Sequence, residues 1–239
     1  SKSEVERTKV IGFFNDSQSF IGNAAGYPSE DKPSGTQSEL ADVGFFLNGS
    51  YSFRNRYYAD ATYRTTGSSQ FGENNRFGHF WSTGLAWNIR NEKFMESIRE
   101  KVDLFKLRAS AGYTGKVSFS PFQAITMYEY KNSYEYKYGI GAIPLTIGNV
   151  DLTWERTMTY NVGIDLSFFN RRLNFVLDAY LKQTKDLLLD KSKAPSTGVT
   201  SAKENIGELE NKGIEYQLDG FIFQNNNFYW KLGTSGYVN

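Results

Sequence analysis

The sequence of 239 residues contains no cysteine, a single histidine, and almost equal numbers of basic (27) and acidic (26) side chains. Without cysteine there is no disulfide framework, which excludes a small disulfide-stapled secreted scaffold, and there is no thiolate chemistry. A metal site made of His and Cys ligands cannot be assembled either. Because the charge is balanced, nothing favours a nucleic-acid partner or an acidic substrate, and we expect no nucleic-acid partner.

Long apolar runs are also missing. No stretch of 18 apolar residues occurs, so the sequence predicts no transmembrane helix. The chain opens on the polar "SKSEVERTKV", without Met or a signal-peptide pattern. It ends on "KLGTSGYVN", inside a strand-like pattern, and we therefore expect that both ends are cut from a longer protein.

Aromatic residues and glycine, by contrast, are frequent. The chain has 4 Trp, 16 Tyr and 19 Phe, together 16% of its residues, and 22 Gly. This composition suits a turn-rich all-β protein better than a helical one. The stretch "YNVGIDLSFFNRRLNFVLDAYLKQTKDLLL" (160–189) shows two alternating runs joined by a four-residue turn. Each run exceeds the 5 to 6 residues that a strand of a soluble protein typically has.

Alternation of this kind recurs along the chain and predicts about nine strands. They lie at 5–14, 41–53, 57–66, 79–90, 103–114, 153–168, 173–187, 205–223 and 228–238. The connectors are of two kinds. Tight polar turns occur at 54–56, 169–172 and 224–227, whereas the long connectors 15–40, 67–78, 115–152 and 188–204 are rich in Gly, Ser, Asn and Pro. If consecutive strands are antiparallel, all tight turns fall at one end of the sheet and all long loops at the other.

Long alternating strands with short turns at one end and long loops at the other are typical of a bacterial outer-membrane β-barrel. Such a strand needs about 9 to 11 tilted residues to cross the hydrocarbon layer. On the hairpin quoted above, we place Val162, Ile164 and Leu166 toward lipid and Asn161, Asp165 and Ser167 toward the lumen. The alternative is a soluble β-sandwich or a large β-solenoid. Strand length and loop asymmetry argue against it, although alternation alone does not.

One segment departs from the strand pattern. In "NEKFMESIREKV" (91–102), Phe94, Met95, Ile98 and Val102 have helical spacing, and Asn91 is a candidate N-cap. We expect a short amphipathic helix near 92–100, at the tight-turn end, lying against the barrel rim. The alternative is a docking surface for a periplasmic partner.

Four blocks then carry a specific resemblance. "TTGSSQFGENNRFGHFWSTGLAWNIRNEKFM" (65–95), "FKLRASAGYTGK" (105–116), "NVDLTWERTMTYNVGIDLSFFNRRL" (149–173) and "ENIGELENKGIE" (204–215) occur in the order found in the C-terminal barrel half of SusC/RagA-family TonB-linked outer-membrane transporters, which they resemble. The departures are small. Thr66, Trp81 and Val150 stand where the family often has Asp, Pro and Pro. They flank loops and leave the expected fold unchanged.

The resemblance implies that residues 1–239 are a fragment of one TonB-dependent-receptor β-barrel domain, all-β and antiparallel. A plugged transporter of this type has about 22 strands. The plug domain, the TonB box and the final strands are therefore expected to lie outside this sequence. The resemblance also implies a bacterial outer-membrane location, contact with outer-membrane lipid, and energy supplied by TonB acting on the plug.

The function implied by the resemblance is import of a glycan or peptide, with a SusD-like surface lipoprotein as a lid over the barrel mouth. The alternative is a non-transporting outer-membrane barrel component, such as a scaffold, an adhesin or an assembly partner. A plug domain in the complete gene would favour the importer, and its absence would favour the alternative.

The longest loop supplies the candidate contact residues. In "MYEYKNSYEYKYG" (127–139) tyrosines alternate with charged residues, so a hairpin would place them on one face. These are Tyr128, Tyr130, Tyr134, Tyr136 and Tyr138. Aromatic faces stack on sugar rings or peptide side chains, and a Tyr hydroxyl hydrogen-bonds polar ligands. Contact with substrate, contact with a lid protein and packing within the loop all remain open.

An enzyme is not expected, and neither is a cofactor. His79 lies at a predicted strand start, and a carboxylate-only metal site stays open without a motif that supports it. Glu204, Glu208, Glu210 and Glu215 could form an acid/base pair, but they fall in a block that resembles the family, so a solvated rim is expected. The glycines of "GIGAIP" (139–144) do not follow a strand-to-helix pattern and are no phosphate loop.

Trp154 and Glu155 are expected at the rim where a long loop enters the barrel wall, with the Trp as a membrane-interface anchor.

Overall fold

The computed structural model describes residues 2–7, 9, 34–119, 123–136, 139–225 and 227–239. The chain divides into two units, Ser1–Ala41 and Asp42–Asn239. In the first unit, β1 (Lys2–Arg7) pairs antiparallel with β2 (Ser34–Glu39) and with no strand of the second unit. The strand predicted at 5–14 therefore overlaps β1 in part, but it is not a strand of the large sheet, and residues 10–14 lie outside the described part of the chain.

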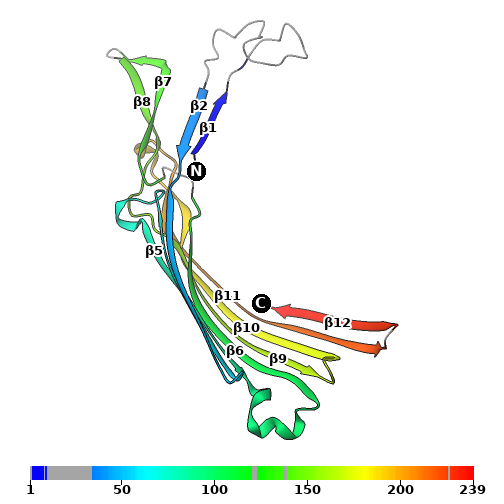
Figure 1. The fold of residues 1–239 in the computed structure, drawn as a ribbon. Coiled ribbons are helices and arrows are strands. Elements are labelled where there is room, and N and C mark those ends of the chain that lie inside the picture. The colour runs from blue at the N-terminus through cyan, green and yellow to red at the C-terminus, as the bar shows by residue number, and fades with distance from the viewer. Residues whose placement is uncertain (1, 8, 10–33, 120–122, 137–138, 226) are drawn as a thin grey trace, which may run out of the picture. The chain divides into compact units, whose positions relative to one another are not determined.

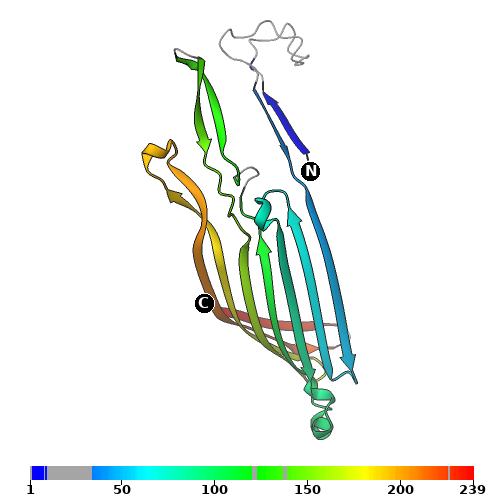
Figure 2. The same cartoon turned by 90° about the vertical axis from the view of Figure 1, so that its left-hand side faces the viewer.

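The second unit is built on one antiparallel sheet of eight strands in the order β12-β11-β10-β9-β6-β5-β4-β3 (Figures 1 and 2). The strands are β3 (Asp42–Phe53), β4 (Tyr57–Ser68), β5 (Phe77–Asn88), β6 (Val102–Lys116), β9 (Glu155–Phe168), β10 (Leu173–Ser192), β11 (Ser201–Gln224) and β12 (Tyr229–Val238). Each strand has at least 10 residues, enough to cross a hydrocarbon layer. The eight strands predicted from 41 to 238 are confirmed.

Connector length separates the two ends of this sheet. Residues 54–56 and 169–172 are tight turns, with φ near 52° at Arg54 and Asn55 and near 60° at Asn170 and Arg171. Positive φ at both central residues is the geometry of a type I′ hairpin turn, whose twist matches that of the strands. The connectors that follow β4, β6 and β10 are longer and lie at the opposite end, as Figure 2 shows. The predicted division into a tight-turn end and a long-loop end is confirmed for these connectors, whereas most of the connector predicted at 15–40 lies outside the described residues.

The longest connector, between β6 and β9, contains its own hairpin. β7 (Met127–Tyr136) pairs with β8 (Gly139–Thr146) in a separate two-stranded sheet, while β6 pairs directly with β9 in the large sheet. The hairpin is held at its base, where Asn149 donates from its backbone nitrogen to the Gln123 carbonyl at 3.2 Å. The chain therefore leaves the wall, forms a projection at the long-loop end, and returns to the adjacent position (Figure 1).

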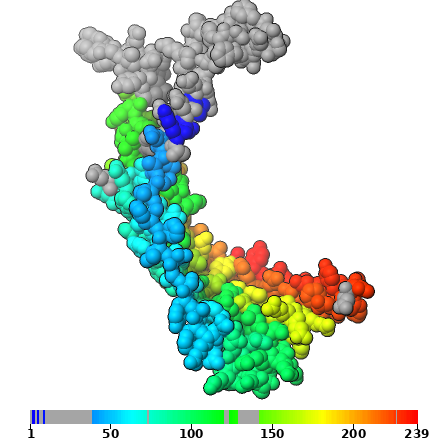
Figure 3. All heavy atoms as spheres, in the orientation of Figure 1, coloured from blue at the N-terminus to red at the C-terminus, as the bar shows by residue number. Residues whose placement is uncertain are grey.

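The helical segment at the tight-turn end consists of 3-10 turns, η3 (Ile89–Asn91) and η4 (Lys93–Ile98). Two further 3-10 turns, η2 (Glu73–Asn75) and η5 (Pro195–Thr197), lie in long loops. Glu92, not Asn91, precedes η4, and no side chain caps it. Met95 and Val102 are buried against Ile89, whereas Phe94 and Ile98 are exposed. The segment thus packs against the rim as predicted, but only part of its apolar face is used. It is the green coiled segment below the strands in Figure 1, and the atoms around residue 100 are green at the lower end of Figure 3.

Little of the wall is buried. The two buried apolar clusters lie at its ends, around Trp154 and around Met95, and not between two layers. In the described residues no second large sheet packs on the first, which contradicts the sandwich alternative. Among those residues no helix is long and apolar enough to cross a membrane.

Candidate functional site: the two faces of the wall and its loop rim

One face of the sheet carries an unbroken apolar row across all eight strands. The residues that lie opposite one another on successive strands in this row are Tyr51, Ala59, Leu85, Ala109, Val162, Ala179, Ile214 and Val238. Large side chains in it are exposed, with Leu85 at 60% and Val162 at 59%. On a soluble protein, exposed apolar surface of this extent would promote aggregation, whereas a barrel wall presents such a band to lipid.

The adjacent row, one residue along each strand, lies on the opposite face. Its partners are Ser50, Asp60, Gly84, Ser110, Asn161, Tyr180 and Gly213. Apart from the amphipathic Tyr180, every member is polar or glycine, and the side-chain period of two keeps the two rows on separate faces. The faces predicted for the hairpin 160–189 agree, since Val162, Ile164 and Leu166 pair with Ala179, Leu177 and Phe175.

Three charged side chains cross-link the polar face. Arg108 on β6 donates from Nε and Nη2 to both carboxylate oxygens of Asp165 on β9, each at 2.8 Å. The same Nη2 donates to Asp178 on β10 at 3.2 Å. Arginine forms such planar, two-point contacts because its donors match the spacing of a carboxylate. The cluster thus ties three strands together on the face that a barrel directs to its lumen.

Gly163 makes this arrangement possible. It lies between Arg108 and Asp178 in the register, on the same face. A Cβ at this position would be 2.4 Å from the Asp178 carboxylate oxygen and 2.7 Å from Arg108 Nη2. Any larger residue would therefore have to displace the ion pair.

A second polar chain runs along the same face nearer the tight turns. Ser167 donates to Asn174 Oδ1 at 2.8 Å, Asn174 Nδ2 donates to Asp219 at 3.1 Å, and the Lys231 ammonium lies 3.0 Å from the same carboxylate. The chain connects β9, β10, β11 and β12 in sequence. These contacts pair the polar groups of the wall with one another on this face.

The rim at the long-loop end joins two of the blocks that carry the family resemblance. Asn205 on β11 accepts from the Thr153 backbone nitrogen at 3.0 Å and donates to the Thr153 carbonyl at 2.9 Å. Asn149 Nδ2 donates to the Lys203 carbonyl at 3.1 Å, while Asn149 Oδ1 accepts from Asp151 in a local turn. The segment before β9 is therefore tied to β11, although β10 lies between their strands in the sheet.

Trp154 belongs to the interior of this rim. It is 7% exposed and packs against Phe71 and Phe80, with ring centroids 4.5 and 5.4 Å away. Its indole nitrogen donates to the Asn75 carbonyl at 3.2 Å. Its predicted position beside the start of β9 is right, but the predicted role as a membrane-interface anchor is wrong, because loop residues enclose the ring. Glu155 begins β9 and accepts from the Leu188 backbone nitrogen at 3.0 Å.

Glu92 anchors the segment at the opposite end. It is 9% exposed and accepts from Tyr57 Oη at 2.7 Å and Trp87 Nε1 at 3.0 Å, with Arg56 3.2 Å away. The hydrogen bond from Tyr57 and that from Trp87 stabilise the charged form, so the pKa of Glu92 lies below its ordinary value, and Arg56 acts in the same direction against burial. One carboxylate thus holds η3 and η4 against β4 and β5.

The five candidate tyrosines fall in and beside β7. Tyr128 is 63% exposed. The β7–β8 pairing shifts register between Lys131 and Glu135, so regular alternation does not extend through the whole strand. The side chains of Tyr130, Tyr134 and Tyr136, and the whole of Tyr138, lie outside the described part of the structure. The predicted hairpin is present, and contact of these residues with a ligand or lid stays a prediction.

His79 is an exposed strand residue whose Nδ1 lies 2.7 Å from Tyr63 Oη. Within the ranges that the structure describes, no three or more His, Asp or Glu side chains gather as metal ligands. Glu204, one of the carboxylates considered above, contacts the ammonium groups of Lys191 and Lys193 at 2.7 Å each.

Taken with the strand lengths, the apolar and polar faces and the asymmetric connectors define the wall of a large antiparallel barrel of the outer-membrane type. The family model described as TonB dependent receptor-like, beta-barrel, matches residues 5–239. TonB-dependent receptor P39 of Formosa agariphila is 39% identical over 180 residues, covering 75% of this chain and 17% of the receptor. TonB-dependent receptor SusC of Bacteroides thetaiotaomicron is 34% identical over 196 residues, covering 80% and 19%.

Among solved structures, the RagAB peptide transporter matches 98% of this chain and 25% of the solved chain, with a TM-score of 0.83 and 29% identity. The chain thus belongs to the TonB-dependent receptor β-barrel family, in its SusC/RagA branch. Proteins of this family are outer-membrane transporters of Gram-negative bacteria and not enzymes. The chain spans 17% to 25% of the length of these relatives.

Proposed function

We propose that this chain is part of the barrel wall of a TonB-dependent importer in the bacterial outer membrane. The observation that carries the proposal is the pair of adjacent rows across the sheet, one of aliphatic residues and Tyr51 that is mostly exposed, the other of polar residues, Tyr180 and glycine. In this assignment the Val162 row faces lipid and the Asn161 row faces a wet lumen. The Arg108 cluster then holds the lumen side of β6, β9 and β10 together.

The substrate class that we propose is a glycan or a peptide. Support comes from the likeness to SusC and to a structure described as a peptide transporter, together with the β7–β8 hairpin at the long-loop end. An exposed aromatic such as Tyr128 can stack on a sugar ring or an apolar peptide side chain. Tyr130, Tyr134, Tyr136 and Tyr138 are proposed with it as contacts for substrate or lid.

Two protein partners accompany this proposal. A SusD-like lipoprotein closes over the long-loop end as a lid, and TonB supplies energy through a plug domain. The long loops then face the exterior and the tight turns face the periplasm. No cofactor and no nucleic acid takes part in this function.

Orientation is tested with short epitope tags in the protein expressed from its complete gene. A tag beside Pro195, in the exposed turn η5, should bind antibody on intact cells. A tag beside Asn225, in a tight turn, should bind only after the outer membrane is opened. Labelling of Asn225 on intact cells with Pro195 protected would contradict the proposed orientation.

Transport is tested by uptake of fluorescent oligopeptides and oligosaccharides in a strain that lacks the gene, with and without the complementing gene. We expect uptake of one of the two classes, lost when TonB is removed. A protein that is inserted in the outer membrane and yet supports no TonB-dependent uptake of either class would favour the alternative of a non-transporting barrel component.

The tyrosines are tested in the same strain. Replacing Tyr128, Tyr130, Tyr134, Tyr136 and Tyr138 together with serine should reduce uptake or lid capture while barrel assembly stays normal. Replacing Tyr160 and Tyr216, which lie on the apolar face of the wall, provides a control of the same residue type outside the hairpin. Unchanged uptake and lid capture in the hairpin variant would assign these tyrosines to loop packing.

A further inference from the structure

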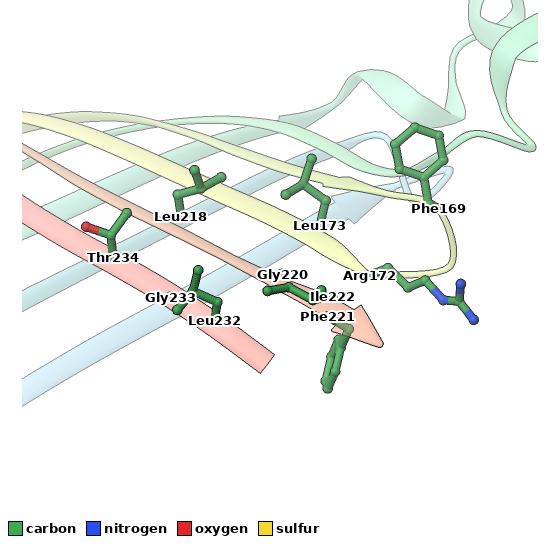
Figure 4. Close-up of a pocket in the computed structure, with 10 residues that line it drawn as sticks. All are labelled: Phe169, Arg172, Leu173, Leu218, Gly220, Phe221, Ile222, Leu232, Gly233 and Thr234. Atoms are coloured by element: carbon green, nitrogen blue, oxygen red, sulfur yellow. The ribbon is translucent and has the colours of Figure 1, made fainter. Parts of the chain in front are cut away.

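A groove of about 730 Å³ lies on the apolar face beside the tight turn 169–172 (Figure 4). Leu173 on β10, Leu218 on β11 and Leu232 on β12 form its walls, and Phe169 stands at its turn end. Leu173 and Leu218 share the face of Ala179 and Ile214, from which they are separated by an even number of strand residues. The volume is in the range of roughly 300–1,000 Å³ that accommodates a small organic molecule.

The open end of this groove carries a cation. Arg172 lines it from the turn 169–172, next to the first residue of β10, and its side chain extends from the turn in Figure 4. The salt bridges of the described residues do not include Arg172. The groove therefore has an apolar interior that ends, at the level of the turns, beside a guanidinium available to an external anion.

Phospholipid has this distribution of chemistry. In an outer-membrane barrel, short turns lie at the membrane boundary on the periplasmic side, where the headgroups of that leaflet are found. An acyl chain would lie along the leucines, and its phosphate would reach Arg172, because guanidinium binds phosphate through paired donors. We propose that this groove is a binding site for a phospholipid of the periplasmic leaflet.

A second hollow on the same face provides an internal comparison. It is lined by Tyr51, Leu85, Leu107 and Val162, among others, and has a volume of about 490 Å³. Arg108, its one charged lining residue, points its guanidinium to Asp165 and Asp178 on the polar face. This hollow is apolar without a cation for a headgroup, so it should hold only the exchanging lipid that surrounds any barrel.

The experiment uses the protein from its complete gene in phosphatidylethanolamine nanodiscs that contain a phosphatidylglycerol probe with a photoreactive acyl chain. Labelled peptides are mapped by mass spectrometry. We expect labelling around Leu173, Leu218 and Leu232 several-fold above labelling of the second hollow. A diacylglycerol carrying the same photoreactive chain, but no phosphate, serves as the parallel probe.

Two variants with matched controls separate groove and charge. Thr234→Trp, which fills the groove from β12, should reduce groove labelling several-fold, whereas Ala179→Trp, on the same face outside both hollows, should not. Arg172→Gln should reduce labelling by the phospholipid probe and leave labelling by diacylglycerol unchanged. Arg171→Gln, its neighbour in the turn outside the groove, should alter neither.

Even labelling of both hollows, or equal loss with Arg171→Gln, would overturn the proposal. So would a groove that is labelled only after a dimer is dissociated, since a second copy would then be its occupant. The inference rests on the proposed membrane location but fails separately from it. A protein with normal heat-modifiable gel mobility and evenly distributed label would retain the barrel wall and lose only the lipid site.

Discussion

Two hydrogen bonds, of 3.0 and 2.9 Å, join the side chain of Asn205 to the backbone of Thr153 and so connect the segment before β9 to β11. The asparagine side chain presents one acceptor and one donor in one plane, as a neighbouring backbone would. Its Nδ2 also donates to the carbonyl of Asp186 at 2.7 Å, in the bulge of β10. A single side chain therefore completes the hydrogen bonds of three segments at the long-loop end.

Replacing Asn205 with alanine should loosen this end of the wall. Thr153 and Asp186 would lose their partners, and leaving part-buried backbone groups unpaired costs about 1–3 kcal/mol. We expect faster backbone hydrogen exchange at residues 150–155 and 184–190 in Asn205→Ala. Asn211→Ala, an exposed position further along β11, is the matched control. Equal hydrogen exchange in the two variants would show that the two hydrogen bonds between Asn205 and Thr153 do not stabilise the rim.

Gly163 should be intolerant of even one added methyl group. In Gly163→Ala the new Cβ would meet Arg108 and Asp178 at less than 3 Å, so the ion cluster must separate. Overpacking of this kind typically costs about 1–3 kcal/mol. Gly112→Ala serves as the control: Gly112 lies on β6 on the same polar face, and its new Cβ would be 3.5 Å from the nearest atom. The measurement is the temperature at which heat-modifiable mobility is lost, which should fall only in Gly163→Ala.

A second substitution can show whether the stability lost in Gly163→Ala comes from the clash with the Arg108–Asp178 ion pair or from crowding in general. Asp178→Ser in the Gly163→Ala background removes the nearer clash and should recover part of the lost stability. If the double variant is no more stable than Gly163→Ala, the loss of stability does not come from the clash with Asp178.

Acid should release the 3-10 segment at the tight-turn end. The pKa of Glu92 is lower in the folded protein than its ordinary value of 4.5, chiefly because of the hydrogen bonds from Tyr57 and Trp87. A depressed carboxylate pKa contributes stability that is fully present above the ordinary value and is lost as pH falls through the folded value. Cleavage of residues 89–101 by an acid-active protease should therefore accelerate below about pH 4.5.

The control for this prediction is Glu92→Gln, which cannot titrate. In this variant the segment should be more accessible at neutral pH. As the pH falls, its cleavage rate should change only as the activity of the protease itself changes. A wild-type segment that stays equally protected from pH 7 to pH 3 would contradict the role given to Glu92.

The strands of the wall could be predicted from sequence because each alternates for ten or more residues, and alternation alone fixes which side chains share a face. Val162 and Ile164 are separated from Asn161 and Asp165 by local geometry, whatever the neighbouring strand. The end of the sheet at which each tight turn lies could be predicted as well, because every second connector in a series of antiparallel strands lies at the same end.

Features that depend on contacts between distant segments could not be predicted in this way. Trp is a residue type typical of membrane-interface anchors, and only the packing of Phe71 and Phe80 against the ring of Trp154 shows that it is enclosed. The bulge at Asp186, with φ of 58°, and its contact with Arg156 at 2.6 Å have no local signal.

The polar cluster was likewise beyond the sequence pattern. Asp165 was assigned to the lumen by alternation, but its partner Arg108 lies 57 residues away, and the register that aligns them is a property of the folded sheet. For this reason Asp165→Arg is a poor test of the polar face, since it would place two guanidinium groups together. Asn161 has no such ion pair and tests the face more simply.

The most direct test of the barrel wall is therefore Val162→Arg against Asn161→Arg in the protein expressed from its complete gene. The two positions are adjacent on β9 and lie in the apolar and the polar row. An arginine on the lipid face near the bilayer midplane costs about 2–4 kcal/mol, whereas a lumen position tolerates polarity. Measured by heat-modifiable gel mobility of outer-membrane fractions, Asn161→Arg should assemble as the wild type does and Val162→Arg should assemble poorly. Equal assembly of the two variants would contradict a lipid-facing wall.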